Sequence, residues 1–171
     1  MLKLGKNVFE ENLKCLMNKK FNCISRASDM LCLFIGDDYT FVSRGREINV
    51  ADFSLHVQTQ WRFTKDDAII LGSHDIYEPY SHSVPDNWEY DIFDRKDEES
   101  SIFDVTSKTL NVKMLNAIVL DVAVSTFGDI RIAFSNGVLF ETFTFASRKA
   151  EVWRLIDYKT HTHTVFHDME E

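Results

Sequence analysis

Four polar side chains alternate with apolar ones in the segment 52–63, and their types suit the binding of a ligand. They occupy every second position, so a single strand would place all of them on one face. They are His56, Gln58, Gln60 and Arg62. A guanidinium binds a carboxylate or phosphate through two parallel hydrogen bonds. The pattern predicts either the wall of a ligand groove or the solvated face of a half-exposed sheet, and we favour the second.

A Trp-Arg dipeptide occurs twice, as Trp61-Arg62 and Trp153-Arg154, and offers a second polar grouping. On a strand the ring and the guanidinium face opposite sides, so each strand would bury its Trp and present its Arg. A binding site could be assembled from Arg62, Asp75, Glu151 and Arg154. Cross-strand ion pairs, which contribute about 0.2–1 kcal/mol each, are the alternative that we favour.

The phrase Gly72-Ser73-His74-Asp75 contains the three residue types of a serine hydrolase. Members of such a triad come from distant segments, and no Gly-x-Ser-x-Gly motif occurs in the chain. A strand that ends in a turn, with Asp75 bonded to nearby backbone, explains the phrase more simply. We therefore assign no catalytic residue and do not expect an enzyme.

Three histidines near the end of the chain are candidate metal ligands: His161, His163 and His167. On a strand the first two would share a face. No cysteine or carboxylate stands beside them at a spacing typical of zinc sites. The sequence predicts no metal and no other cofactor.

The segment 72–99 is predicted to be a long irregular loop, because it contains both prolines and shows no periodicity. Between Asp86 and Asp104 eight acidic residues stand against two basic ones, which accounts for most of the net charge of −8. Aromatic side chains lie among the acids, and Trp and Tyr often anchor interfaces. The segment predicts either a docking site for a basic protein or a solvated loop. The candidate partner-binding residues are Trp88, Tyr90, Asp91, Asp94 and Asp97.

The elements expected to position these residues are mostly strands. A helix is predicted over 7–20, and a short second one over 100–110. The predicted strands are 23–26, 30–35, 52–63, 68–71, 117–125, 130–135, 138–145, 151–157 and 162–166. Those from 117 to 157 are expected to form a four-strand antiparallel meander, with Leu120 on the core face of the first. The expected fold is one α+β domain over 1–171, mostly antiparallel sheet, with the N-terminal helix packed against it.

Composition excludes several classes of protein. The acidic balance disfavours nucleic-acid binding, which needs clustered Lys and Arg. Charged residues interrupt Met1–Lys20, so no signal peptide is expected there, and no apolar run is long enough to span a membrane. The three cysteines form no pair spaced by two residues: Cys15, Cys23 and Cys32. Reduced, buried thiols in a cytoplasmic protein are expected.

Five phrases of the sequence, in their order and spacing, resemble a group of small uncharacterised bacterial proteins. The central phrase is Leu55-His56-Val57-Gln58 followed by Trp61-Arg62, and the group carries a Leu-His-x-Gln-x-x-Trp-Arg phrase. The other phrases are 26–30, 71–75, 134–137 and 151–155. The resemblance covers the chain from the end of the first helix onward and implies a bacterial, cytosolic protein, with no activity to carry over. Thr59-Gln60 stand where many members have Cys-Pro, so no role is assigned to that pair.

Two functions are consistent with these features. We favour a non-catalytic interaction protein that docks a basic protein through the acidic, aromatic loop. Small acidic bacterial proteins that neutralise basic toxins have a comparable composition. The alternative is a small-ligand-binding protein or enzyme that uses the polar strand face around His56, Gln58 and Arg62. An enclosed pocket lined by Gln58 and Arg62 would favour the alternative, whereas a flat face and an exposed loop would favour docking.

Overall fold

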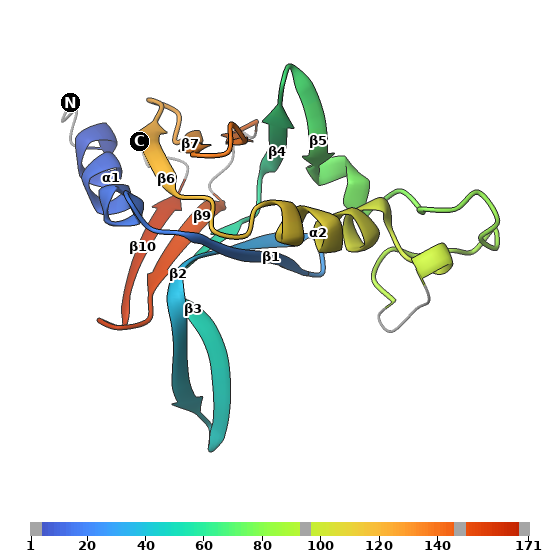
Figure 1. Ribbon diagram of the computed structural model, residues 1–171, viewed down its shortest axis with the longest axis horizontal. Helices are drawn as coiled ribbons and strands as arrows, with labels where there is room; N and C mark the ends of the chain where they lie inside the picture. The colour runs from blue at the N-terminus through green and yellow to red at the C-terminus, as the bar shows by residue number, and fades with distance from the viewer. Residues whose placement is uncertain (1–4, 93–96, 146–149, 168–171) are drawn as a thin grey trace.

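The computed structural model describes residues 5–92, 97–145 and 150–167, and these residues form two five-stranded antiparallel sheets and two α-helices (Figure 1). The strand order is β1-β2-β3-β9-β10 in the first sheet and β5-β4-β8-β7-β6 in the second. The predicted class, mostly antiparallel β with few helices, is confirmed. The strands are β1 (Phe21–Ala27), β2 (Met30–Ser43), β3 (Arg46–Val57), β4 (Gln60–Lys65), β5 (Ala68–Gly72), β6 (Val119–Val124), β7 (Ile130–Phe134), β8 (Leu139–Phe143), β9 (Glu151–Asp157) and β10 (Thr162–His167). The α-helices are α1 (Gly5–Leu13) and α2 (Ile102–Lys113).

The predicted strand 52–63 is in fact two strands that belong to different sheets. Strand β3 pairs with β9 up to Val57, and β4 pairs with β8 from Gln60. The backbone N–H of Gln58 donates to the carbonyl of Val152 in β9. The hydroxyl of Thr59 donates to the carbonyl of Phe143 in β8 at 2.6 Å. One core lies between the sheets, so the buried positions keep alternating through this corner and the sequence resembles one strand.

The predicted four-strand meander is wrong in its last member. Strands β6, β7 and β8 follow one another in the second sheet, but β9 lies in the first sheet between β3 and β10. The buried side chains of β9 belong to the one core that both sheets share. The apolar pattern of β9 therefore does not reveal which sheet the strand joins. A bulge in β6 also shifts the predicted alternation. Val119 is buried and Leu120 is exposed, because an extra residue moves the following side chains to the other face.

Helix α1 is shorter than the predicted helix over 7–20. It ends at Leu13 and is followed by a 3-10 turn, Lys14–Leu16. Met17 then leaves the helical region with ψ of 137°, and Asn18 takes a positive φ of 62°, so the chain turns toward β1. The helix contacts β6 and β10, one edge strand of each sheet, and Leu13 and Leu16 are fully buried there. Neither helix of the described residues is long and apolar enough to cross a membrane.

A close contact at Gly128 joins the two sheets. Gly128 lies in the turn between β6 and β7 with φ of +84°, and its carbonyl accepts the indole N–H of Trp153 at 2.8 Å. The ring of Phe166 stacks on Trp153 and occupies the space where a Cβ of Gly128 would lie. Phe9 of α1 packs edge-on against both rings. Glycine is therefore required at this position for conformation and for space.

Strands β2 and β3 extend past their neighbours as a two-stranded arm, residues 38–50, which Figure 1 shows pointing away from the other strands. A bulge at Gly36 marks its base, where a Cβ would meet Asp52 at 2.6 Å. The buried carboxylate of Asp52 pairs with Lys159 at 2.6 Å. The ring of Phe41 stacks on Tyr158 at 5.1 Å. The ring stack thus joins the arm to the turn after β9, and the ion pair holds the same turn to β3 beside the base of the arm.

The Gly128 contact predicts a large loss of stability for G128A. An alanine at this position must keep a positive φ, and its methyl group overlaps the Phe166 ring. Together these two effects should lower the free energy of unfolding by about 3 kcal/mol. G137A is the matched control, because Gly137 has φ of +82° and no atom within 4 Å of its Cβ position. Urea unfolding should show a loss of about 1 kcal/mol for the control. Equal losses in the two variants would contradict the packing argument.

Candidate functional site

Four of the six residues predicted to bind a ligand lie together on the face of the first sheet turned away from the core. His56 of β3 lies opposite Arg154 of β9. The Arg154 guanidinium donates two hydrogen bonds to the Glu151 carboxylate, from Nε at 2.9 Å and from Nη2 at 2.6 Å. The Gln58 amide donates to the same carboxylate at 3.4 Å. His163 of β10 lies 3.3 Å from Arg154, and sequence reasoning considered it only as a metal ligand.

The charges of this face largely satisfy one another. Glu151 neutralises Arg154 through a bidentate pair. Burial lowers the pKa of His56, and the nearby Arg154 charge acts in the same direction while Glu151 opposes it. His56 is therefore neutral at pH 7. Glu151 and Arg154 both belong to β9, so this ion pair lies within one strand and is not the predicted cross-strand pair. It leaves little charge on this face for a ligand.

Arg62 and Asp75 lie elsewhere, so the six residues do not form a single site. Arg62 stands on β4 in the second sheet and donates to Glu141 of β8 from Nε at 3.0 Å and from Nη2 at 2.9 Å. The carboxylate of Asp75 accepts the backbone N–H of Gly72 at 2.7 Å, a local turn bond. The row from His56 to Arg62 is divided because the chain changes sheets in the middle of it.

The segment predicted as an irregular loop over 72–99 contains two 3-10 turns, Ser73–Ile76 and Asp97–Glu99. Between the first of these turns and α2 lies a loop, of which residues 77–92 and 97–101 are described. We call it the acidic loop, and it extends from the body at the right of Figure 1. Backbone bonds close its neck, among them Tyr80 N–H to Ser100 at 2.8 Å. The loop is thus held at its base.

The two aromatic residues predicted to bind a partner make contacts within the protein. The indole N–H of Trp88 donates to the Glu99 carbonyl at 2.7 Å. Tyr90 packs against the core and meets the Tyr77 ring edge-on at 4.8 Å. Of the predicted acids, Asp91 is exposed, Asp97 pairs with Lys108 at 2.6 Å, and Asp94 lies outside the described residues.

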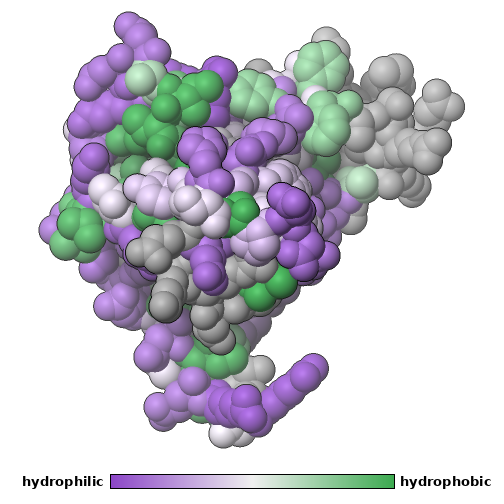
Figure 2. Space-filling view, turned by 90° about the vertical axis from the view of Figure 1, so that its right-hand side faces the viewer, coloured by the Kyte–Doolittle hydropathy of each residue, from purple (hydrophilic) through white to green (hydrophobic). Residues whose placement is uncertain are grey.

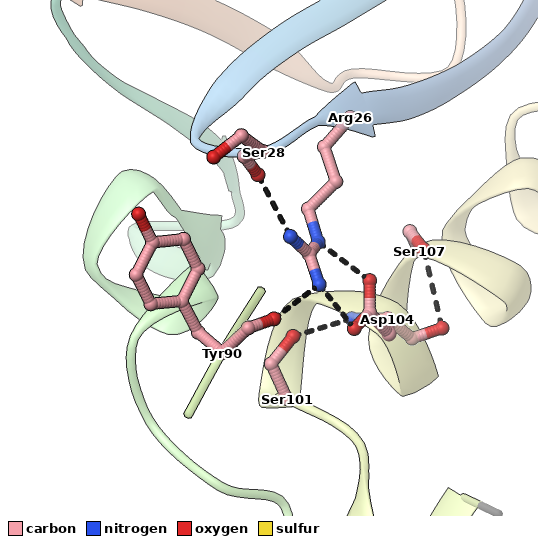
Figure 3. Close-up of polar contacts among 6 residues, drawn as sticks. All are labelled: Arg26, Ser28, Tyr90, Ser101, Asp104 and Ser107. Carbon is pink, nitrogen blue, oxygen red and sulfur yellow. Dashed lines mark hydrogen bonds and ion pairs between the residues drawn. The ribbon is translucent and has the colours of Figure 1, made fainter. Parts of the chain in front are cut away.

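A buried arginine connects the acidic loop to the rest of the fold. Figure 3 shows Arg26 extending from β1 between Tyr90 and α2. Its side chain is 4% exposed and donates to both oxygens of Asp104 at 2.8 Å. It also donates to the carbonyls of Ser28 at 2.7 Å and Tyr90 at 2.8 Å. We call Arg26 with these three partners the Arg26 latch.

Sequence reasoning missed the Arg26 latch, although part of its signal was present. Ser101 caps α2, since its hydroxyl accepts the backbone N–H of Asp104 at 3.1 Å. A Ser followed three residues later by an acid is a known start signal of a helix. The partner of Asp104 is 78 residues away in sequence, so no local pattern indicates it.

A hollow of about 350 Å³ lies beside the acidic loop, where the two sheets meet. The segment 58–60 of the corner, the β1–β2 turn and the first 3-10 turn contribute to it. We call it the Tyr77 hollow; its lining residues are Asp29, Gln58, Thr59, Gln60, Ser73, His74, Tyr77 and Phe145. Arg62 does not line it. The hydroxyl of Tyr77 donates to Asp29 at 3.1 Å, which joins one wall to the rim.

No three side chains of the metal-ligating types gather anywhere in the described parts of the chain. His161 has a positive φ of 56° in the turn before β10, whereas His163 lies within that strand beside Arg154. The predicted sharing of one strand face by these two histidines is therefore wrong, since His161 stands outside the strand.

The Arg26 latch predicts a pH-dependent contribution to stability. Burial alone would raise the pKa of Asp104. The hydrogen bonds and the charge of Arg26, together with the hydrogen bonds of Ser101, lower that pKa. A lowered folded-state pKa gives stability that is present above the unfolded pKa of about 4 and is lost as pH falls through the folded value. D104N should lower the free energy of unfolding by about 3 kcal/mol at pH 7. The difference from wild type should shrink below about pH 4.

Urea unfolding from pH 2 to 8 measures this difference. D121N is the matched control, because Asp121 pairs with Arg131 on an exposed strand face at 3.8 Å and should cost less than about 1 kcal/mol. A D104N deficit that stays constant down to pH 2 would contradict the assigned role.

Comparison with known proteins provides no relative from which a role for these residues could be taken. The resemblance carried by the phrase from Leu55 to Arg62 therefore remains a prediction. The chain matches no protein-family model, no curated protein and no solved structure.

Proposed function

We propose that this chain is a non-catalytic, bacterial, cytosolic interaction protein that docks a basic protein through the acidic loop. The observation that carries the proposal is a group of three exposed carboxylates: Asp86, Glu89 and Asp91. Within the described residues, no cation lies at ion-pair distance from any of the three. Charge of one sign on a small surface accelerates association with a partner of the opposite sign.

Exposed apolar surface accompanies these carboxylates. Tyr80 is 55% exposed and Ile92 is 49% exposed, and both belong to the acidic loop. Figure 2 looks onto the side of the molecule that bears the loop and shows a mostly hydrophilic face with small, separate apolar patches. Aromatic and aliphatic side chains among charges are typical of transient interfaces, in which a few buried groups provide most of the affinity.

The internal bonds of the acidic loop also support docking. A loop that must be ordered on binding loses affinity, because each immobilised side chain costs about 0.5–1.5 kcal/mol. Here Trp88 and Tyr90 already fix the loop through Glu99, Arg26 and Tyr77. Glu89 and Asp91 thus flank residues whose positions are already fixed by bonds within the protein.

The polar strand face gives less support to a ligand-binding protein. Gln58 lines the Tyr77 hollow, but Arg62 is paired with Glu141 in the second sheet. Arg154 and Glu151 satisfy each other beside His56. Within the described residues, the Tyr77 hollow is lined by Gln58 but not by Arg62, which gives the ligand-binding alternative less support.

The proposal predicts that partner capture depends on the charge of the acidic loop. The triple variant D86N/E89Q/D91N should lose at least tenfold in association rate at low salt, because these three charges provide the steering. Its stability should change by less than about 0.5 kcal/mol, since the side chains are exposed. Affinity capture from bacterial lysate, followed by association kinetics with the captured protein, measures the effect.

E47Q/D66N/D67N is the matched control, since it removes three exposed carboxylates from the arm and the β4–β5 turn. Wild type and control should retain the same stoichiometric basic partner, and the loop variant should release it. Retention of that partner by the loop variant, or capture of an acidic partner, would refute docking through the acidic loop.

A further inference from the structure

The Tyr77 hollow has a pattern of free hydrogen-bonding groups that bears on what it can hold. Three of its lining residues already use donors within the protein. Gln58 donates to Glu151 at 3.4 Å, Thr59 donates to Phe143 at 2.6 Å, and Tyr77 donates to Asp29 at 3.1 Å. These three residues keep free oxygen acceptors: the Gln58 amide carbonyl, the Thr59 hydroxyl oxygen and the Tyr77 phenolic oxygen. Gln60 and Ser73, which also line the hollow, bring further oxygen acceptors together with donors of their own.

The phenol of Tyr77 stays in the donating form. Burial, followed by the charge and hydrogen bond of Asp29, raises its pKa to about 12. The phenolic proton therefore remains directed to Asp29 at neutral pH. The Tyr77 ring is 42% exposed, and Phe145, which also lines the hollow, is 70% exposed. The hollow thus combines accessible aromatic rings with oxygen acceptors.

Among the described residues that line the hollow, one carboxylate stands against no lysine or arginine. Asp29 contributes an exposed carboxylate at the rim. His74 is the one lining residue that can carry positive charge, and its Nε2 lies 3.2 Å from the Glu78 carboxylate. A ligand that brings hydrogen-bond donors and positive charge fits this environment better than an anion or an acceptor-rich molecule.

We propose that the Tyr77 hollow receives an arginine side chain of the basic partner, an inference that rests on the proposed docking function. A guanidinium has five donors and no acceptor, carries its charge at all accessible pH values and stacks on aromatic rings. The volume of about 350 Å³ accommodates one long side chain. Carboxylate, acceptor oxygens and rings converge here as such a group requires.

The hollow is continuous with the acidic loop, so one partner can reach both. The Tyr77 ring meets Tyr90 of the loop edge-on. The Arg26 latch holds the Tyr90 carbonyl and the Ser28 carbonyl next to Asp29. A single basic surface would place one arginine in the hollow while its other cations face Asp86, Glu89 and Asp91.

The test uses N-acetylarginine methylamide as the probe, titrated into the full chain and followed by amide chemical shifts. The shifts should be confined to Asp29, the segment 58–60 and the segment 73–77. The citrulline analogue, a neutral isostere, should bind at least tenfold more weakly, since it lacks the charge. D29N should weaken arginine binding about tenfold, as expected for loss of one charged hydrogen bond.

Two further variants keep the result interpretable. Q60E adds a carboxylate to the rim and should tighten arginine binding several-fold, which a folding defect cannot do. D67N removes a distant exposed carboxylate and should bind like wild type. Equal binding of the citrulline probe, an unchanged affinity in D29N, or shifts centred elsewhere would overturn the assignment.

The outcome separates this inference from the proposed function. D86N/E89Q/D91N should still bind the arginine probe within twofold of wild type, because those side chains do not line the hollow. If partner capture depends on the loop acids but the probe does not bind, only the arginine assignment fails. If the probe binds but capture does not depend on those acids, docking through the acidic loop fails.

Discussion

The acidic loop and the Tyr77 hollow depend on one buried guanidinium, that of Arg26. Arg26 is almost inaccessible to water, so its charge requires full compensation, and Asp104 with two carbonyl groups provides it. Each partner belongs to a different segment: the β1–β2 turn, the acidic loop and α2. Satisfying one side chain therefore fixes three segments relative to one another. The positions of Asp29 and Tyr90, and through Tyr90 that of Tyr77, follow from this constraint.

The sequence allowed most strands to be predicted, because alternation of apolar residues marks them wherever one face is buried. It did not allow the strands to be assigned to sheets. The segment around Gln58 keeps its period while the chain changes sheets, and β9 has a pattern that either sheet could accept. Both sheets face one core, so burial carries no information about hydrogen-bonded neighbours. The bulge in β6 shows the same limit on a smaller scale, since a single extra residue put Leu120 outside.

The candidate site was predicted in composition more than in arrangement. The concentration of acids was evident, and Asp86, Glu89 and Asp91 lie exposed as a solvated or docking loop requires. Trp88 and Tyr90 were expected to face a partner, but a loop of this length also needs its own internal contacts. Aromatic residues provide these contacts for the same reason that they suit interfaces: a large apolar body with a polar end. Arg26 was missed because its partners are distant in sequence.

The arm formed by β2 and β3 has a consequence for how the molecule meets copies of itself. Strand β1 pairs with β2 only up to Ile35, and β9 pairs with β3 only from Phe53. Within the described residues, the outer edges of the arm therefore leave backbone groups without a neighbouring strand, which is a template for edge-to-edge aggregation. Exposed Arg44, Arg46 and Glu47 at the tip oppose such pairing. Charge at the tip of the arm thus works against edge-to-edge pairing between copies of this chain.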